Sequence, residues 1–274
     1  MDGISVAIIT YNEERNLADC IRSCEEVADE IVVLDSFSTD RTEEIARSFP
    51  KVRFSQHPFD GHVQQKNRAL ALCRNEWVLS LDADERVTPE LRAEIRALDP
   101  GDRDGFRVPR LTFLMGKPIR HSGWYPQRKY RLFKRSRARW AGENPHDHIV
   151  VDGRGGALRG DLLHYTVTDV AHHVDTVNKF SSIAAFNRFH QGRRFSALTA
   201  VLKPFAKFLE VYLVKRGFLD GFHGFAVAVA ASYFTFLRVT KIYELERGLI
   251  ERPSNLRSDY QPQASTGASG SPPR

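Results

Sequence analysis

The sequence predicts an α/β fold, in which a mainly parallel sheet with flanking helices is followed by a C-terminal helical extension. Three observations predict it: short β-rich runs alternate with helical patterns over the first hundred residues, the connections between them are short, and acidic residues directly follow three of the runs. Such alternation is typical of right-handed βαβ units, whose strands lie parallel in one sheet.

The first hundred residues contain four strand–helix pairs. The predicted strands are residues 4–10, 31–34, 52–56 and 77–81. The first helix carries Leu17, Cys20, Ile21 and Cys24 on one face, which predicts that both cysteines lie in the core. The later helices are predicted at residues 40–49, capped by Thr39 or Asp40, at 63–73, and at 88–98 with Pro89 in the first turn.

The pattern changes after Pro100. Shorter strands are predicted at residues 106–114, 129–133, 148–151 and 158–165, separated by turns rich in glycine and proline. A helix is then predicted from Asp169 to Gln191, ending at Gly192. The expected organisation is an α/β domain over residues 1–167, a helical region over 168–250 and a disordered tail over 251–274, where Ser, Gly, Pro and Gln are abundant.

The helical region contains two apolar patterns. An amphipathic stripe repeats at spacings of three and four through Phe195, Leu198, Leu202, Phe205, Leu209 and Tyr212, and Pro204 is expected to start or kink that helix. Residues 224–237 then form 14 positions without a charge, fewer than the roughly 20 that span a bilayer. Three interpretations stay open for this segment: a core helix or dimer contact, a membrane-surface anchor, and a true span.

Composition limits the class of protein and of partner. The 274 residues include 42% hydrophobic and 27% charged positions, which excludes a chain disordered throughout. Three cysteines cannot make a disulfide framework, and no signal peptide is predicted before Ile4, so a reducing compartment is expected. The formal net charge of +6 favours anionic partners, whether nucleic acid, nucleotide ligands or an acidic membrane surface.

Acidic residues follow three of the predicted strands. Residues 10–14 read TYNEE after the first strand, residues 35–40 read DSFSTD after the second, and residues 82–85 read DADE after the fourth. Ligands of open α/β sheets bind at the carboxyl ends of the strands. Carboxylates gathered there repel one another unless a cation or a donor-rich ligand lies among them. Asp82 and Asp84 alternate, and such a pair can bind a hard divalent ion while leaving positions for phosphate oxygens.

A second segment interleaves basic and aromatic side chains. Residues 121–135 read HSGWYPQRKYRLFKR. Aromatic faces stack on sugar rings and arginines pair with phosphate, so the segment suits a phosphorylated glycolipid acceptor. The same pattern also suits single-stranded nucleic acid.

These motifs resemble glycosyltransferase family 2, whose members are inverting nucleotide-sugar enzymes of GT-A fold, and within it the bacterial lipopolysaccharide-core group typified by the heptose β-1,4-glucosyltransferases. The resemblance covers roughly residues 4–165 and extends to about 247. The matching segments are ITYNEERNL at 9–17, VVLDSFSTDRT at 32–42, QQKNRAL at 64–70, LSLDADE at 79–85, HSGWYPQRKYRLFKR at 121–135, ENPHD at 143–147 and GDLLHY at 160–165.

The resemblance implies a role for each matching position. The expected donor-binding residues are Thr10, Tyr11, Glu13, Asp35, Lys66 and Asp82, with Lys66 suited to the diphosphate. Asp84 is expected to bind Mg²⁺ or Mn²⁺, with His164 as a further ligand. Asp147 is the expected catalytic base and Glu143 its substitute, because the group usually has Val-His-Glu where this chain has Pro-His-Asp. The acceptor residues are expected to be Trp124, Tyr125, Arg128 and Arg131.

The resulting hypothesis is a metal-dependent, inverting transferase that moves one hexose, with glucose favoured, from a nucleotide diphosphate sugar to a lipopolysaccharide-core or related glycolipid. Peripheral contact with the cytoplasmic face of the inner membrane is expected, a homo-oligomer is left open, and nucleic acid is not expected as a partner. Two alternatives stay open: a polyprenyl-phosphate glycosyltransferase, and a non-catalytic module that binds nucleotides or nucleic acid.

Overall fold

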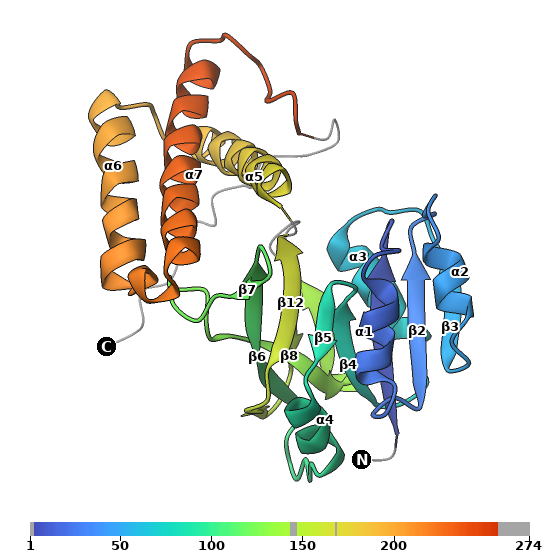
Figure 1. The fold of residues 1–274 in the computed structure, drawn as a ribbon. Coiled ribbons are helices and arrows are strands. Elements are labelled where there is room, and N and C mark those ends of the chain that lie inside the picture. The colour runs from blue at the N-terminus through green and yellow to red at the C-terminus, as the bar shows by residue number, and fades with distance from the viewer. Residues whose placement is uncertain (1–2, 143–146, 168, 257–274) are drawn as a thin grey trace, which may run out of the picture. The chain divides into compact units, whose positions relative to one another are not determined.

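The computed structural model describes residues 3–142, 147–167 and 169–256 and divides into two compact units (Figure 1). Unit 1 comprises residues 1–113 and 124–166, and unit 2 comprises 114–123 and 167–274. The sequence predicted a domain boundary after residue 167. In the structure, the segment 114–123 also belongs to the helical unit. Glu143, the substitute base, and residues 257–274 of the expected tail lie outside the described residues.

Unit 1 is the predicted α/β domain. Its strands are β1 Ile4–Thr10, β2 Glu30–Asp35, β3 Val52–Gln56, β4 Trp77–Asp82, β5 Glu85–Val87, β6 Gly105–Leu114, β8 Gln127–Lys134, β9 Ala138–Ala141, β10 His148–Val151, β11 Gly155–Ala157 and β12 Leu162–Val167. Its helices are α1 Leu17–Cys24, α2 Thr42–Arg47, α3 His62–Leu72 and α4 Pro89–Arg96. The main sheet has the order β3-β2-β1-β4-β8-β6-β12-β5. Strands β3, β2, β1 and β4 are parallel, whereas β8 is antiparallel to β4 and to β6.

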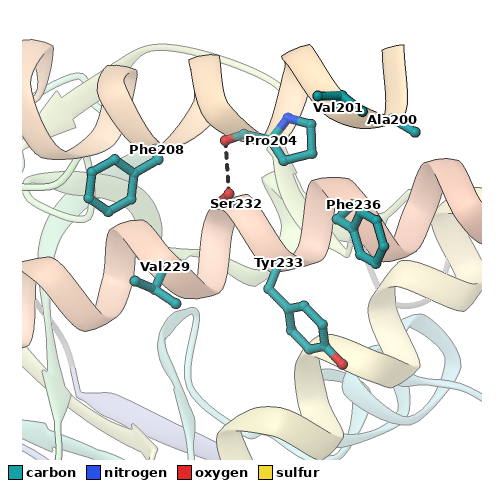
Figure 2. A pocket seen from close by; sticks show the side chains of 8 residues that line it. All are labelled: Ala200, Val201, Pro204, Phe208, Val229, Ser232, Tyr233 and Phe236. Carbon is teal, nitrogen blue, oxygen red and sulfur yellow. Dashed lines mark hydrogen bonds between the residues drawn. The ribbon is translucent and has the colours of Figure 1, made fainter. Parts of the chain in front are cut away.

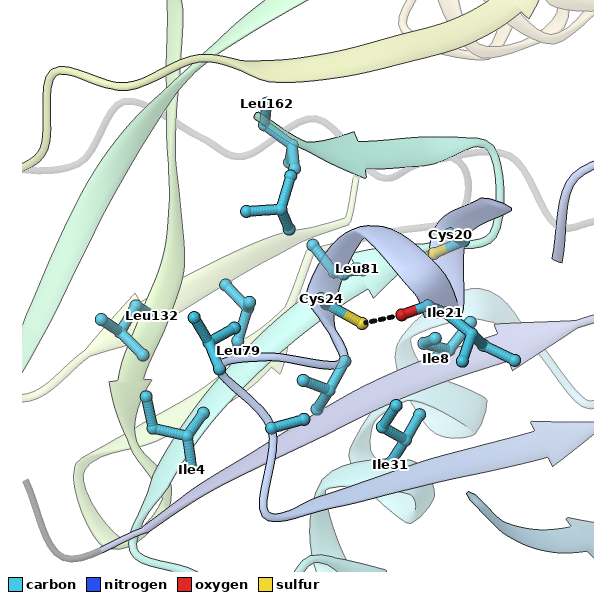
Figure 3. Close-up of a cluster of buried hydrophobic side chains, with 14 of the residues drawn as sticks. Ile4, Ile8, Cys20, Ile21, Cys24, Ile31, Leu79, Leu81, Leu132 and Leu162 are labelled. Carbon is cyan, nitrogen blue, oxygen red and sulfur yellow. Dashed lines mark hydrogen bonds between the residues drawn. The ribbon is translucent and has the colours of Figure 1, made fainter. Parts of the chain in front are cut away.

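The alternation of apolar side chains along the parallel strands places one core on each face of the sheet. In β1, Val6 and Ile8 pack with the α1 residues that the sequence predicted, including both cysteines (Figure 3). Ala7, between them, packs on the opposite face with Ala69 and Leu70 of α3. The core prediction for Cys20 and Cys24 is therefore confirmed, since both are fully buried.

Two elements are shorter in the structure than predicted, because side-chain carboxylates accept hydrogen bonds from backbone N–H groups near their ends. The helix predicted at 40–49 is α2, Thr42–Arg47, and the Asp40 carboxylate before it accepts the backbone N–H groups of Thr42 and Glu14. The strand predicted at 158–165 begins only at Leu162, since the N–H groups of Arg159 and Gly160 donate to the Glu94 carboxylate instead of to a neighbouring strand.

Unit 2 is built from three long helices. They are α5 Val170–His190, α6 Ala197–Leu209 and α7 Phe222–Glu246, and the short strand β7 Lys117–Pro118 precedes them in this unit. The Asp169 side chain caps α5 by accepting the His172 N–H, and the helix begins at Val170, one residue after the predicted start. Pro204 lies inside α6, where Ser232 of α7 donates its hydroxyl to the Pro204 carbonyl (Figure 2). Within the described residues α7 is the one helix long and apolar enough to cross a membrane, by length and composition alone.

The connection between α6 and α7 is closed by one buried carboxylate. Asp220 accepts the backbone N–H groups of Arg120 and His121 and also pairs with the His121 ring, while Lys117 donates to its carbonyl. This acceptor lies about a hundred residues from its donors, so no local pattern predicts the contact. The turn is also tight, since a Cβ on Gly224 would lie 1.8 Å from the Gly217 carbonyl oxygen.

Gly224→Ala tests this close approach. Alanine favours a helix over glycine by about 1 kcal/mol, so propensity alone predicts a more stable protein. The steric overlap predicts the opposite sign, with a cost of about 1–3 kcal/mol that is typical of overpacking. Thermal unfolding, followed by circular dichroism, shows whether Gly224→Ala raises or lowers the melting temperature. Gly248→Ala, with open space around the added Cβ but a φ of +65°, is the control for backbone strain without overlap. An unchanged or raised melting temperature for Gly224→Ala contradicts the prediction.

Candidate active site

The acidic strand ends meet at one edge of the sheet in unit 1. Thr10 pairs in register with Asp35 of β2, and Ile9 pairs with Asp82 of β4, so the three strands end level with one another. The chain reverses its direction of progress across the sheet between β1 and β4, which is where open α/β sheets bind ligands. The residues that the sequence predicted as donor ligands therefore lie around one point.

The loops after β1 and β2 are cross-linked into one rigid rim. The Asn12 N–H donates to the Ser38 hydroxyl at 2.8 Å, and the Asn12 amide oxygen accepts the Thr39 N–H at 2.8 Å. Both loops place a residue in the left-handed region, Asn12 at φ 55° and Phe37 at φ 59°. Tyr11 and Phe37 are left 60% and 52% exposed, respectively. Two aromatic side chains thus stand exposed on joined loops, and the sequence reasoning overlooked Phe37, a large apolar residue in a polar loop.

Asp35 lies beneath this rim and is fully buried. Its carboxylate accepts hydrogen bonds from the hydroxyls of Thr10 and Ser38, at 2.8 and 2.5 Å, and from the Ser38 N–H at 2.8 Å. These donors come from both loops. Asp35 therefore fixes the rim from below, and Thr10, which is also buried, is one of its partners.

Glu13 shares its surroundings with Asp84. The Glu13 N–H donates to the hydroxyl of Thr42, the first residue of α2. The Glu13 carboxylate accepts a hydrogen bond from the Asn16 side-chain amide at 2.9 Å. Burial, followed by the nearby Asp84 and Asp40 carboxylates, raises the pKa of Glu13, although Asn16 opposes the shift. A cation bound near Asp84 would relieve this repulsion.

Asp82 is held by two cations. Lys66 of α3 lies 2.8 Å from one carboxylate oxygen, and Arg131 of β8 lies 2.8 Å from the other. Burial opposes ionisation, but Lys66 and Arg131 outweigh it and hold the pKa of Asp82 well below its usual range. The Asp82 carboxylate is therefore ionised and fixed in orientation on both sides.

Glu85 is an anchor to which the sequence reasoning gave no role. It is fully buried, accepts the Asp82 N–H at 3.0 Å, and pairs with the Arg131 guanidinium at 2.5 Å. Burial raises the pKa of Glu85 despite the Arg131 charge. Arg131, expected among the acceptor residues, is 2% exposed. Its guanidinium donates hydrogen bonds to the carboxylates of Asp82 and Glu85.

Lys66 joins the donor side of the site to the expected base. Its ammonium lies 2.8 Å from Asp147 as well as from Asp82, and 4.2 Å from the centre of the Trp140 ring. Burial would lower the pKa of Lys66, but the two carboxylates raise it above its ordinary value. Asn67 exchanges two hydrogen bonds with the Trp140 backbone, which fastens β9 to α3. Trp140 lies outside every motif that marks the site in the sequence.

The second carboxylate of the motif faces a histidine. Asp84 Oδ2 lies 3.3 Å from Nε2 of His164 on β12, and the other ring nitrogen shares a hydrogen bond with the Thr112 hydroxyl at 3.3 Å. A metal-binding histidine is usually oriented through its second nitrogen in this way. No cluster of three or more candidate ligands is found among residues 3–142, 147–167 and 169–256. The Asp84 carboxylate nevertheless fits Mg²⁺ or Mn²⁺, since Mg²⁺ sites commonly take one or two carboxylates and fill the rest with substrate phosphates and water. A nitrogen ligand such as His164 suits Mn²⁺ better than Mg²⁺.

The remaining expected acceptor residues lie in unit 1. The Tyr125 hydroxyl donates to the Asp161 carboxylate at 2.9 Å, and Arg128 on β8 donates to the Leu158 carbonyl at 2.9 Å. Trp124 is half-buried at the start of the same segment. Lys129, next to Arg128, is a further cation; desolvation first, and then Arg110 and Arg131, lower its pKa to about 8.

Comparisons with known proteins identify the family. The family model described as glycosyl transferase family 2 matches residues 5–158. The lipopolysaccharide core biosynthesis glycosyltransferase LpsC of Rhizobium meliloti is 32% identical over 259 residues, covering 92% of this chain and 95% of that protein. An uncharacterized glycosyltransferase of Rickettsia typhi is 31% identical over 262 residues, covering 89% of this chain and 88% of that protein.

Two solved structures are also similar. S. aureus TarS 1-349 in complex with UDP-GlcNAc has 14% identity and a TM-score of 0.48, covering 90% of this chain and 92% of that one. Glucosyl-3-phosphoglycerate synthase from Mycobacterium tuberculosis, in complex with Mn²⁺ and UDP-glucose, has 25% identity and a TM-score of 0.32, covering 40% of this chain and 44% of that one. Both TM-scores are below 0.5, so the assignment rests on the sequence matches. With the acidic edge of its α/β sheet, the chain is an enzyme of GT-A fold that belongs to glycosyltransferase family 2.

Proposed function

We propose that the enzyme transfers one hexose, with glucose favoured, from a nucleoside diphosphate sugar to a lipopolysaccharide-core or related glycolipid, and inverts the anomeric centre. The observation that carries the proposal is the Lys66 ammonium, which lies 2.8 Å from both Asp82 and Asp147. One cation thereby sets the donor-binding carboxylate and the base at a fixed separation. The similarity to LpsC, a lipopolysaccharide core biosynthesis glycosyltransferase, supports the acceptor class.

The donor occupies the rim and the ends of β1, β2 and β4 in this proposal. Tyr11 and Phe37 offer aromatic faces to the nucleotide base, and Glu13 offers an acceptor to the ribose hydroxyls. Asp35 and Thr10 support that rim from beneath, where the Thr10 hydroxyl donates to the Asp35 carboxylate, and their expected contact with the donor stays a prediction. Asp82 faces the sugar. Mg²⁺ or Mn²⁺ held by Asp84 and His164 would supply positive charge to the diphosphate.

The transfer is a single displacement. The acceptor hydroxyl oxygen forms a bond to the anomeric carbon, the bond from that carbon to the diphosphate oxygen breaks, and the diphosphate leaves with the electron pair. Asp147 takes the hydroxyl proton. Lys66 keeps Asp147 oriented through the 2.8 Å contact between its ammonium and the carboxylate. Arg131 and Glu85 act as positioning residues for Asp82, a correction to the acceptor role that the sequence suggested for Arg131, whose side chain is buried.

The acceptor and the membrane contact are assigned to different parts of the chain. Trp124, Tyr125 and Arg128 are proposed to contact the acceptor sugar and phosphate. Residues 168–250 contain eleven Lys or Arg and six Asp or Glu, and they leave large apolar side chains of α6 and α7 exposed. This combination supports peripheral contact with the anionic cytoplasmic face of the inner membrane.

Asp147→Asn tests the base. The amide cannot accept the proton, so transfer to a hydroxyl acceptor is expected to fall about 100- to 10,000-fold, the usual contribution of general base catalysis. Donor affinity is expected to stay within a few-fold, measured by calorimetry with the nucleoside diphosphate. Asp152→Asn, on the exposed end of the same hairpin, is the matched control and is expected to keep full activity. Unchanged transfer by Asp147→Asn would instead favour an acceptor that is already an anion, such as a polyprenyl phosphate.

Asp84→Asn tests the metal site without relying on turnover. We expect the affinity for Mn²⁺ in the presence of a nucleoside diphosphate to fall by at least about 10- to 100-fold, since even loss of a ligand-orienting partner costs that much. Paramagnetic resonance of free Mn²⁺ gives the affinity directly. His164→Gln should weaken Mn²⁺ in the same direction, whereas Asp19→Asn, an exposed carboxylate paired with Arg22, should not. Equal Mn²⁺ affinity in all three variants would show that Asp84 and His164 do not bind the metal.

Lys129 makes donor binding depend on pH. Its ammonium is charged below its pKa of about 8 and neutral above it, so its attraction for the diphosphate is present at pH 7 and is lost as the pH rises through about 8. Lys66 keeps its charge over that range because its pKa is raised. Nucleoside diphosphate affinity, titrated from pH 7 to pH 9 at constant ionic strength, should therefore decline for the native enzyme. Lys129→Arg should abolish the decline because it keeps its charge over this range, and Lys129→Met should show, at every pH, the low affinity that the native enzyme reaches at pH 9. A decline that persists in both variants would show that another group causes it.

A further inference from the structure

Unit 2 contains an apolar cavity that the transfer reaction does not use. It has a volume of about 320 Å³ and lies between α5 and α7, with Leu114 and Met115 at one side. Its walls include Val170, Val174, Phe222 and Phe225, and each of these four side chains is exposed. The cavity is therefore open at the surface of the unit. Its lining is mainly apolar, with Asp169, His173 and Tyr233 as its polar residues.

A second apolar groove lies on the other flank of α7. Pro204 and Phe208 of α6 form one wall, and Val229, Tyr233 and Phe236 of α7 form the other (Figure 2). Val229 and Tyr233 line both the groove and the cavity. The apolar surface is therefore continuous across α7. Patches of this extent on an otherwise soluble surface usually mark a binding site.

The apolar surface continues along the α6–α7 connection as far as the opening of the α5–α7 cavity. Val214, Leu219 and Phe222 are 77%, 55% and 71% exposed, respectively, and Phe222 also lines the cavity. The connection is not a loose loop, since the buried Asp220 carboxylate fixes it through two backbone N–H groups. Its exposed apolar side chains are thus held outward by the fold.

Charge around the connection identifies the occupant. Lys117 donates to the Asp220 carbonyl, next to Phe222. Arg216 and Lys215, which also pairs with Glu210 at 2.6 Å, are exposed within the connection itself. A second copy meeting this surface about a two-fold axis would set the same cations against one another. An anionic bilayer offers hydrocarbon for the apolar side chains and opposite charge for the cations.

We propose that the α5–α7 cavity binds an acyl chain of an anionic membrane lipid, which enters past Phe222 while the α6–α7 connection rests in the bilayer surface. A spanning role for α7 is not part of the proposal. Ser232 ties that helix to α6, and Lys241 ties it to α5 by donating to Asn178, Ser181 and Ser182. The inference deepens the proposed membrane contact and does not depend on the transfer chemistry.

The test uses the full chain and vesicles of phosphatidylcholine, with or without phosphatidylglycerol, whose acyl chains carry bromine. Phe225→Trp places a fluorophore in the cavity wall, and the native protein gives the baseline, since two of its tryptophans, Trp77 and Trp140, are buried in unit 1. We expect bromine to quench the added fluorescence, and only when phosphatidylglycerol is present. Ala230→Phe in this background fills the cavity and should reduce the quenching several-fold.

Ala206→Phe is the matched control, because it adds the same side chain to an exposed position of α6 that lines neither the cavity nor the groove. Ala226→Leu is a milder filling variant if Ala230→Phe does not fold by circular dichroism. Three results would overturn the proposal: no vesicle binding, quenching that the filling variants leave unchanged, and a concentration-dependent blue shift of Phe225→Trp without lipid, which assigns the cavity to a second copy. Transfer to a soluble acceptor, measured alongside, shows whether the proposed function fails independently.

Discussion

The ammonium of Lys66 is the contact on which the active site depends. It lies 2.8 Å from Asp82 and 2.8 Å from Asp147, on the face of the Trp140 ring. The Lys66 side chain is 9% exposed, so its charge is largely desolvated and must be compensated by its partners. Removal of either carboxylate would leave the other charges unbalanced in a buried place. The α3 helix, β4 and the segment before β10 are thereby held together by one side chain.

The surrounding charges alternate in sign. Glu85 binds Arg131, Arg131 binds Asp82, Asp82 binds Lys66, and Lys66 binds Asp147. With Arg110 3.8 Å from Glu85, three cations balance three carboxylates. No surplus positive charge remains in this cluster for the diphosphate of a donor. In the proposed function, additional positive charge comes from outside this cluster, from a metal ion near Asp84 and from the Lys129 ammonium.

The sequence predicted the sheet and the acidic strand ends because both are local patterns. Alternation marks each strand, and Asp82 and Asp84 follow theirs directly. Glu85, Trp140 and Asp220 received no role because their contacts are long-range and form only when distant segments fold together. Lys66 and Asp147 are 81 residues apart, and Asp220 lies 99 residues from His121. Arg131 was assigned to the acceptor because its neighbours are basic and aromatic, a pattern that does not reveal which face of β8 is buried.

The helical stripe shows a second limit of periodicity. Its spacing in α6 correctly predicts that the apolar residues share a face, but Leu198, Leu202 and Phe205 on that face are exposed. Periodicity identifies an apolar face without identifying what covers it. The charges suggest an answer, since residues 1–167 hold equal numbers of basic and acidic side chains and the excess lies almost entirely in residues 168–250. Buried pairs in the catalytic unit are screened little by salt, whereas the exposed cations of the helical unit are screened within about 10 Å. The buried pairs of unit 1 are therefore expected to persist at high salt, whereas the proposed attraction of the helical unit for an anionic surface is expected to weaken.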